Sequence, residues 1–433
     1  GVVTMLLYFK VKNYRSFRDE AILDMEAAQL SDHTDSLLSY GKNKFLPAAA
    51  IFGKNGGGKS NLIRAMWLGV QFICNAQKTQ TENAPVPVRP FGLNDYSNAD
   101  PTSFEFAYVL NGIKYVYGFS ATQQCIVAEY LKSWPNGREK SIFTRNHQNF
   151  VFPKDGERRR KEMIREAVAP NQLFFAMSCT MNYKPCIEAM RWFRECVAFS
   201  RDYTDLNKNL LEYSEDTTML SAIVSTARAA DVGIQDIQFE IDNQVLDENL
   251  PANMRNVVKA LRAFAEALRL SGNESEMQLS TGKLKSTTYH VGTNADGKQQ
   301  YYPLTLSDES DGTRRLMTLS PAIERTLANG GVLIVDELDR ELHPMLVTYV
   351  LSRYMERENN PHGAQIIFTT HDLSLLDQDF LRRDQIYFVD KNREDGASAL
   401  YSLVEFNVRN DANVLKAYLI GKFGAIPEIE EVH

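Results

Sequence analysis

The stretch that decides the fold is Gly53-Lys54-Asn55-Gly56-Gly57-Gly58-Lys59-Ser60, which follows the apolar run PAAAIF at residues 47–52. It has the form G-x-x-x-x-G-K-[ST], and residues 61–76 behind it carry apolar side chains at the spacing of a buried helix. An apolar strand, a glycine-rich loop and a helix in this order open a phosphate-binding α/β domain. The sequence therefore predicts a P-loop at residues 53–60.

The residue types in this loop suit the binding of a triphosphate. Glycines let the backbone wrap around an anion, so that its N–H groups and the N-terminus of the following helix point at a phosphate. Lys59 can bring a positive charge to the β- and γ-phosphates, and the hydroxyl of Ser60 can ligate Mg²⁺. The alternative is a glycine-rich turn that binds no ligand, but the matching strand and helix favour phosphate binding. The expected backbone cradle consists of Gly53, Asn55, Gly56 and Gly58.

A second chemical signal is the run VLIVDE at residues 332–337, a buried strand that ends in an acidic pair. We expect Asp336 to lie near the metal and Glu337 beside the γ-phosphate, where it can polarise an attacking water as general base. Two acids at the end of an ordinary strand are the structural alternative. The P-loop in the same chain favours the catalytic interpretation.

A histidine closes the next apolar strand, where the run QIIFTT at residues 365–370 is followed by His371. Such a side chain can hydrogen-bond a γ-phosphate and sense its hydrolysis. A lone histidine is more often structural, but the carboxyl ends of parallel strands are where α/β sheets bind ligands. We therefore expect His371 to take part in the site.

The polar run LSDESDGTRRL at residues 306–316 opens an apolar helix. By itself it predicts only a helix N-terminus, because Ser310 and Asp311 are good capping residues.

In this order the motifs resemble those of an ABC-type ATPase: Walker A, a signature loop at 310–312, Walker B with its catalytic glutamate, a D-loop at 338–339 and the switch histidine. The run NYRSF at residues 13–17 resembles the opening of the SMC/RecF/OLD branch. Within that branch, residues 307–316, 335–344, 368–372, 382–391 and 421–427 look most like the ATPases of prokaryotic phage-defence and abortive-infection operons. The resemblance is close over about residues 5–80 and 300–425 and loose between them.

The resemblance implies an α/β fold, namely an ABC-type P-loop ATPase head that is split by a β-lobe and a helical insertion. It implies ATP and Mg²⁺ as ligands, with Ser60 and Asp336 on the metal and Glu337 and His371 as catalytic residues. It also implies a homodimer, or a higher oligomer, in which Ser310 and Gly312 of one subunit complete the ATP site of the other. ATP would then favour the closed dimer.

Two features depart from the family pattern. Residues 307–312 are not the Leu-Ser-Gly-Gly-Gln of transporters, and Ser310 is the better candidate to face phosphate because it directly precedes x-Gly. The glutamine that normally links the metal to lobe motion has no clear place, since neither Gln71 nor Gln77 fits convincingly.

The pattern of the middle of the chain predicts a β-lobe and then helices. Residues 104–120 alternate on both sides of Asn111-Gly112, which predicts a hairpin with a type I′ turn and a packed lobe rather than a platform on which bases stack. Helices are predicted at 162–169, 186–199, 218–230 and 251–270, and polar strands over 275–306 with turns at Gly282 and 296–297. The predicted divisions are 1–85 and 276–433 for the two halves of the ATPase head, 86–156 for the β-lobe and 157–275 for the helical insertion.

Two functions fit these motifs best. The first is a dimeric ATP-driven switch in antiviral defence that controls a separate effector, a nuclease or a toxin. Only 62 residues follow His371, and a toprim nuclease domain needs on the order of a hundred, so we expect no nuclease in this chain. The second is a RecF/SMC-like DNA-repair ATPase, although residues 157–270 are too short and irregular for a long coiled coil. A transporter ATPase is a weaker third possibility.

Composition limits the partners and the compartment. The 433 residues carry 48 Lys+Arg and 55 Asp+Glu, a net charge of −7 that disfavours bulk coating of nucleic acid and favours a protein partner. A basic run remains that could bind nucleic-acid phosphate, although such a run is usually a solvated face. It comprises Arg158, Arg159, Arg160 and Lys161. Five cysteines without zinc spacing, no apolar run near the roughly 18 residues of a membrane span and no signal-peptide pattern predict a cytoplasmic protein.

Overall fold

The computed structural model describes residues 3–79, 81, 83–154, 156–200, 217–230, 234–242, 283–376, 380–406, 414–419 and 421–423. The predicted helix at 251–270, the predicted turn at Gly282 and the end of the motif at 421–427 lie outside these residues. The chain forms two compact units, one made of Gly1–Arg201 with Arg325–His433 and the other of Asp202–Glu324. Each unit is described by itself.

The P-loop strand lies inside a six-stranded sheet of the first unit, in the order β11-β15-β16-β5-β17-β18. All neighbours are parallel except the β17–β18 pair. Strands β5, β15 and β16 are buried along their whole length, as expected for apolar central strands that are covered on both faces. The strands are β5 (Ala48–Phe52), β11 (Val197–Ser200), β15 (Val332–Val335), β16 (Gln365–Thr369), β17 (Ile386–Lys391) and β18 (Ser398–Ser402).

This sheet joins distant parts of the chain, because β5 lies between β16 and β17, which are more than 300 residues later in the sequence. The structure therefore confirms the predicted α/β fold and the contribution of both ends of the chain to one parallel sheet. The order also places the ends of β15 and β16 on one side of the P-loop and the end of β17 on the other.

A second, antiparallel sheet of seven strands has the order β10-β9-β8-β7-β6-β1-β2. Its hairpin at Asn111-Gly112 is confirmed, with φ of 52° and 78° at the two turn residues, the conformation that a type I′ turn requires. The aromatic side chains Phe104, Phe106 and Tyr117 are buried in the core, so these strands form a packed lobe. The strands are β1 (Met5–Lys12), β2 (Ala21–Asp24), β6 (Thr102–Leu110), β7 (Ile113–Ala121), β8 (Ile126–Trp134), β9 (Lys140–Asn146) and β10 (Asn149–Val151).

The pairing of β1 with β6 places residues from before the P-loop and from the β-lobe in one continuous sheet. No break in this sheet corresponds to the boundary predicted at residue 85. The four-part division of the chain therefore stays a prediction, and what the contacts define is the two units above.

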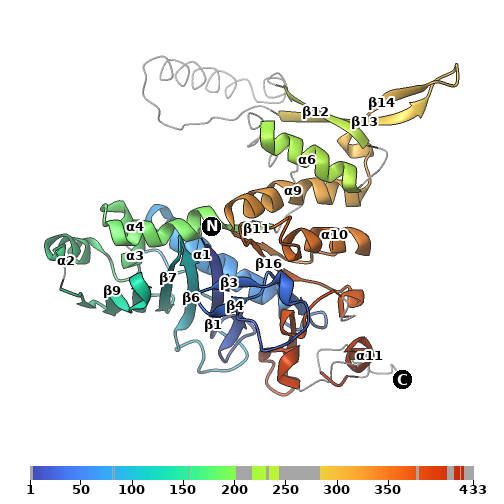
Figure 1. Cartoon of the computed structure of the whole chain (residues 1–433). Helices are drawn as coiled ribbons and strands as arrows, with labels where there is room; N and C mark the ends of the chain where they lie inside the picture. The colour runs from blue at the N-terminus through green and yellow to red at the C-terminus, as the bar shows by residue number, and fades with distance from the viewer. Residues whose placement is uncertain are drawn as a thin grey trace, which may run out of the picture. The chain divides into compact units, whose positions relative to one another are not determined.

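Helices α1, α3 and α4 pack with the seven-stranded sheet to form the main core (Figure 1). The helix predicted at 186–199 is wrong at its end, because a π-helical turn at Trp192–Cys196 leads directly into strand β11. Parallel pairing of β11 with β15 overrides the helical spacing of a short apolar segment that periodicity alone cannot assign. The helices are α1 (Lys59–Thr79), α2 (Arg158–Ala167), α3 (Phe174–Thr180) and α4 (Lys184–Arg191).

Gln365, a fully buried side chain at the start of β16, ties the two sheets together. Its Oε1 accepts a hydrogen bond from the Leu6 amide at 2.7 Å, and its Nε2 donates to the carbonyls of Leu6 and Leu46 at 3.1 and 2.9 Å. The polar side chain thereby pairs backbone groups that a buried strand end would otherwise leave unsatisfied. The remaining elements of this unit are β3 (Leu38–Tyr40), β4 (Asn43–Phe45), α10 (Pro344–Met355), α11 (Val414–Leu419) and the short turns η1 (Thr34–Ser36), η2 (Pro135–Gly137), η5 (Leu373–Leu376), η6 (Arg383–Gln385) and η7 (Leu403–Phe406).

The second unit has a small core of its own, made by α6, strand β12 and Met317 of α9. Strand β12 is the first of a three-stranded sheet in the order β12-β13-β14. The predicted helix at 218–230 is confirmed as α6, and the predicted turn at 296–297 is confirmed by the positive φ of Gly297. Its elements are α6 (Thr217–Ala230), β12 (Ile234–Asp242), β13 (Lys283–Thr293), β14 (Gln299–Thr305), η4 (Leu306–Asp308) and α9 (Asp311–Asn329), whose last residues belong to the first unit.

All five cysteines lie in the described part of the chain and are free thiols. Burial raises the pKa of Cys74, Cys179 and Cys196 to about 11, 12 and 11, which fits packing groups rather than nucleophiles. None of the helices in the described residues is long and apolar enough to span a membrane.

Candidate functional site

The P-loop between β5 and α1 is packed so closely that only glycine fits at two positions. A Cβ at Gly53 would lie 2.4 Å from the carbonyl oxygen of Val389. A Cβ at Gly58, where φ is +119°, would lie 2.5 Å from the Ser398 hydroxyl and 3.0 Å from the Ser16 hydroxyl. These glycines allow neighbouring strands and the N-terminal turn to pack directly against the loop.

Lys59, at the first turn of α1, is 94% buried, since only 6% of its surface is exposed. Its Nζ donates a hydrogen bond to the Gly53 carbonyl at 2.6 Å and lies 3.4 Å from that of Lys54. Burial lowers the pKa of Lys59, while the carboxylates that follow β15 act in the opposite direction. The ammonium is therefore poorly solvated and held over the loop by carbonyl groups, which are weaker partners than a phosphate.

Asp336, which follows β15, lies beside the P-loop hydroxyl. Its Oδ1 accepts a hydrogen bond from Ser60 Oγ at 3.2 Å and another from Thr369 Oγ1, at the end of β16, at 2.7 Å. A hydroxyl next to a carboxylate supplies the hard oxygen donors that Mg²⁺ prefers when phosphate oxygens and waters complete its shell. These two side chains therefore fit a magnesium ion, although the described residues contain no cluster of three or more His, Cys, Asp or Glu that could hold a metal.

Glu337 has a left-handed backbone, with φ of 53°, which is unusual for a residue other than glycine. The Thr369 hydroxyl accepts a hydrogen bond from the Glu337 amide at 2.7 Å, and the Arg340 guanidinium lies 3.8 Å from its carboxylate. Strained backbone of this kind is commonly found at functional sites.

His371 is held next to the D-loop, because its backbone N–H lies 3.2 and 3.1 Å from the two carboxylate oxygens of Asp339. The ends of β15 and β16 are therefore connected directly. A cavity of about 270 Å³ brings Glu337 and His371 together with the P-loop. Its lining includes Lys54, Asn55, Gly56, Gly58, Lys59, Ser60, Asn61, Arg64, Glu337 and His371.

Comparison of the sequence with known protein families assigns the chain to one of them. The sequence matches the family described as "AAA domain, putative AbiEii toxin, Type IV TA system" over residues 48–377. The chain belongs to this family. Membership confirms the prediction that the chain is a P-loop ATPase. A separate comparison with curated proteins found no match.

Solved structures show looser similarity. The SMC head domain from Thermotoga maritima is 14% identical, with 92% of this chain and 98% of that chain covered and a TM-score of 0.38. The recombination mediator protein RecF bound to ATP is 12% identical at the same coverage and TM-score. An SMC head bound to the C-terminal winged-helix domain of ScpA is 12% identical, with 92% and 97% covered and a TM-score of 0.39. At these TM-scores the similarity supports no statement about activity or partners.

The remaining predicted site residues of this AAA-domain protein lie in the second unit. Ser310 caps α9, because its Oγ accepts a hydrogen bond from the Thr313 amide at 3.1 Å and pairs with the Thr313 hydroxyl at 2.8 Å. Gly312 follows in the first turn of the helix. Glu309, which precedes the cap, is buried and lies 2.8 Å from His290 Nε2 of β13.

Several residues of the site were not predicted from sequence. Thr369 and Ser398 lie at the ends of strands, and the Ser398 Oγ donates to the Gly57 carbonyl at 2.6 Å. Ser16 accepts a hydrogen bond from Asn61 Nδ2 at 2.9 Å, and its carbonyl accepts one from the Ser398 amide at 2.6 Å. The sequence offered no specific signal for these three residues, because serines and threonines near strand ends are common in any sequence.

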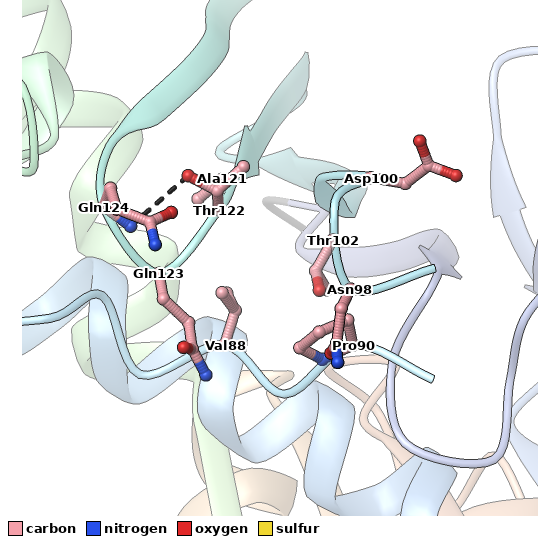
Figure 2. Close-up of a pocket in the computed structure, with 9 residues that line it drawn as sticks. All are labelled: Val88, Pro90, Asn98, Asp100, Thr102, Ala121, Thr122, Gln123 and Gln124. Carbon is pink, nitrogen blue, oxygen red and sulfur yellow. Dashed lines mark hydrogen bonds between the residues drawn. The ribbon is translucent and has the colours of Figure 1, made fainter. Parts of the chain in front are cut away.

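The structure does not identify the lobe-linking glutamine. Gln71 accepts a hydrogen bond from Asn75, one turn further along α1 at 2.8 Å, and nothing is described of the Gln77 side chain. A separate polar hollow has a volume of about 400 Å³. In it, Gln123 and Gln124 of the β7–β8 turn lie across from Asn98 (Figure 2). It contains no P-loop residue, so these glutamines are not part of the cavity above.

The basic run at the start of α2 is only partly exposed. Lys161 is fully buried, and its Nζ donates to the Pro153 carbonyl at 3.0 Å and lies over the ring of Phe152. Arg160 is paired with Glu157 at 3.3 Å and donates to the Asn182 carbonyl at 2.5 Å. The predicted use of Lys161 for nucleic-acid phosphate is therefore wrong, because its ammonium is buried and bonded within its own segment.

Proposed function

We propose that this chain hydrolyses ATP to ADP and phosphate as an Mg²⁺-dependent ABC-type ATPase. The observation that carries the proposal is the single cavity in which Lys59, Ser60 and Glu337 meet beside Asp336. A buried lysine, a hydroxyl, a metal-binding carboxylate and a second carboxylate are the groups that phosphoryl transfer to water needs.

Each group has a distinct task. Lys59 exchanges its loop carbonyls for the β- and γ-phosphates, and the backbone from Gly53 to Gly58 donates its N–H groups to them. Ser60 and Asp336 hold Mg²⁺, which neutralises developing phosphate charge when it is bound. Glu337 accepts a proton from the attacking water, and His371 donates a hydrogen bond to the γ-phosphate.

The resemblance to ABC-type ATPases also suggests a homodimer. In it, Ser310 and Gly312 of each subunit would contact the ATP bound by the other subunit. Supporting this, the Ser310 hydroxyl lies at an exposed helix N-terminus, which attracts anions. Two ATP molecules between two subunits would make the nucleotide a conformational ligand.

We infer that the ATPase works in the cytoplasm as a sensor and switch of antiviral defence, controlling a separate effector such as a nuclease or toxin. The family description, which names a toxin and a toxin–antitoxin system, supports this context. The net charge of −7 also favours a protein partner. The second candidate is a RecF/SMC-like DNA-binding ATPase, for which the burial of Lys161 leaves Arg158, Arg159 and Arg160 of the basic run.

The decisive experiment measures phosphate release by the purified protein with ATP and Mg²⁺, with Glu337→Gln as the inactive control. Mg²⁺-dependent release that Glu337→Gln abolishes supports the ATPase, no release by the parent protein contradicts it, and equal release by both proteins excludes Glu337 as the base. Salt-dependent binding of DNA by the protein alone would favour the second candidate. Copurification with a neighbouring gene product and no DNA binding would favour the switch.

A further inference from the structure

A second hollow adjoins the P-loop on the side away from Asp336 and Glu337. Its volume is about 500 Å³. It shares Lys54, Asn55 and Gly56 with the phosphate cavity, and its other walls are Leu93 and the β17–β18 turn at residues 391–396. We call it the 391–396 hollow. Because the two cavities share the P-loop backbone, one molecule can occupy both.

The strand order determines where this hollow lies relative to Asp336 and His371. Asp336 and His371 follow β15 and β16, on one side of β5, whereas the turn at 391–396 follows β17 on the other side. The carboxyl ends of parallel strands lie at one edge of the sheet, where α/β proteins bind ligands. A nucleoside triphosphate with its γ-phosphate at the acidic residues therefore extends across β5 toward the end of β17.

The walls of the hollow suit a flat molecule with polar edges. Leu93 is 62% exposed, and it packs on Gly396 so closely that a Cβ there would lie 2.4 Å from Leu93 Cδ1. Around this apolar surface stand the polar side chains of Asn392, Arg393 and Glu394. An apolar face with a few polar groups at its rim is the usual environment of a bound heterocycle.

The turn is a fixed part of the site, because bonds anchor it on both sides. Asp390 pairs with Lys54 of the P-loop at 3.1 Å, and Asp395 pairs with Arg18 at 2.7 Å. Within the turn, the Asn392 amide donates to the Ala397 carbonyl at 2.9 Å, and the Ser398 hydroxyl binds the Gly57 carbonyl. These bonds join the turn directly to the P-loop and to the N-terminal segment.

We propose that the 391–396 hollow binds the base and ribose of the nucleoside triphosphate, with Leu93 packed against the face of the base. This inference rests on the proposed function, since it assigns the rest of the same substrate. It predicts that the nucleoside increases the affinity of the protein for ATP. Changing Leu93 should weaken the binding of the nucleoside but not the binding of the phosphates.

The test compares ATP with inorganic tripolyphosphate, which has the phosphates but no nucleoside. Calorimetry with Mg²⁺ should show that ATP binds the unaltered protein at least about tenfold more tightly. Leu93→Ala should weaken ATP binding about threefold to tenfold, and Leu93→Asp more, while tripolyphosphate binding changes less than about twofold. Leu419→Ala is the matched control, because Leu419 is 57% exposed and lies outside both cavities.

Two results would overturn the assignment while leaving the ATPase intact. One is ATP affinity that Leu93→Ala and Leu93→Asp leave unchanged, and the other is an equal loss for ATP and tripolyphosphate. If neither ligand binds the unaltered protein, the proposed function itself fails and the assignment with it. Because Leu93 is exposed, its variants should keep the melting temperature of the parent, which thermal denaturation checks.

Discussion

The Thr369 hydroxyl donates a hydrogen bond to Asp336 Oδ1 at 2.7 Å and accepts one from the next residue, the Glu337 amide, at the same distance. One fully buried hydroxyl at the end of β16 thus fixes both acidic residues at the end of β15. It holds the carboxylate proposed for the metal and the backbone of the proposed general base.

This relationship predicts that Thr369→Val, which keeps the shape and removes the hydroxyl, slows ATP turnover about tenfold to a hundredfold. The loss corresponds to about 1.5–3 kcal/mol for a hydrogen bond to a charged group. Steady-state assays at several Mg²⁺ concentrations should also show a higher requirement for the metal. Thr369→Ser retains the hydroxyl and is expected to stay within a few fold of the parent; equal losses in both variants would point to packing instead.

Lys59→Met should abolish ATP binding and leave the protein at least as stable as the parent without nucleotide. Burial lowers the pKa of Lys59 in the folded chain, so at neutral pH the charged ammonium opposes folding, and its removal relieves that cost. ATP should raise the melting temperature of the parent but not of the variant. The exposed Lys42 supplies the control, Lys42→Met, which should respond to ATP like the parent.

Glu337→Gln should bind ATP normally and lose at least about a hundredfold in turnover, because the amide cannot accept the proton of the attacking water. The ATP-bound dimer should then accumulate. Light scattering with and without ATP measures this accumulation. A variant that turns over ATP at the parental rate would exclude Glu337 as the base.

Mixing two inactive proteins tests whether Ser310 acts across a dimer. Lys59→Met damages the P-loop, and Ser310→Arg damages the signature loop, so a mixed dimer retains one intact composite site. If subunits exchange freely, activity should recover to roughly a quarter of the parental rate. Recovery of phosphate release on mixing is the readout. No recovery, with exchange shown by a tag, would mean that each chain builds its site alone.

The buried pair of Glu129 and Arg145 predicts a stability effect away from the site. The two groups lie 3.2 Å apart with no exposure, and Glu129 also accepts bonds from Tyr117 and the amides of Phe174 and Phe175. Glu129→Ala should therefore lower the free energy of unfolding by about 3–5 kcal/mol. Chemical denaturation measures this loss.

The control for that measurement is Glu139→Ala. Its ion pair with Lys132 at 2.9 Å is half exposed, and such pairs contribute about 0–1 kcal/mol. Similar losses in the two variants would mean that burial does not set the strength of these ion pairs in this protein.

Local patterns predicted the parts of the site that lie on single segments. The glycine spacing at 53–60, the run VLIVDE and the Asn111-Gly112 turn depend on neighbouring residues and could be recognised in the sequence. The strand Val197–Ser200 could not, because its pairing with β15 involves residues more than 100 positions away. The hydroxyls of Thr369 and Ser398 were missed because their partners Asp336 and Gly57 lie on other segments that only tertiary packing brings near. Lys161 was missed although its partner Pro153 is only eight residues away, because a basic run looks solvated in the sequence.

The position of β5 between β16 and β17 has a consequence for protein synthesis. The P-loop is translated early, but the strands on both sides of it leave the ribosome more than 300 residues later. A nascent chain that stops before residue 365 has the P-loop sequence without either of the strands that flank β5 in the sheet. Nucleotide binding should therefore begin late in translation, so that a prematurely terminated chain cannot compete with the finished protein for ATP.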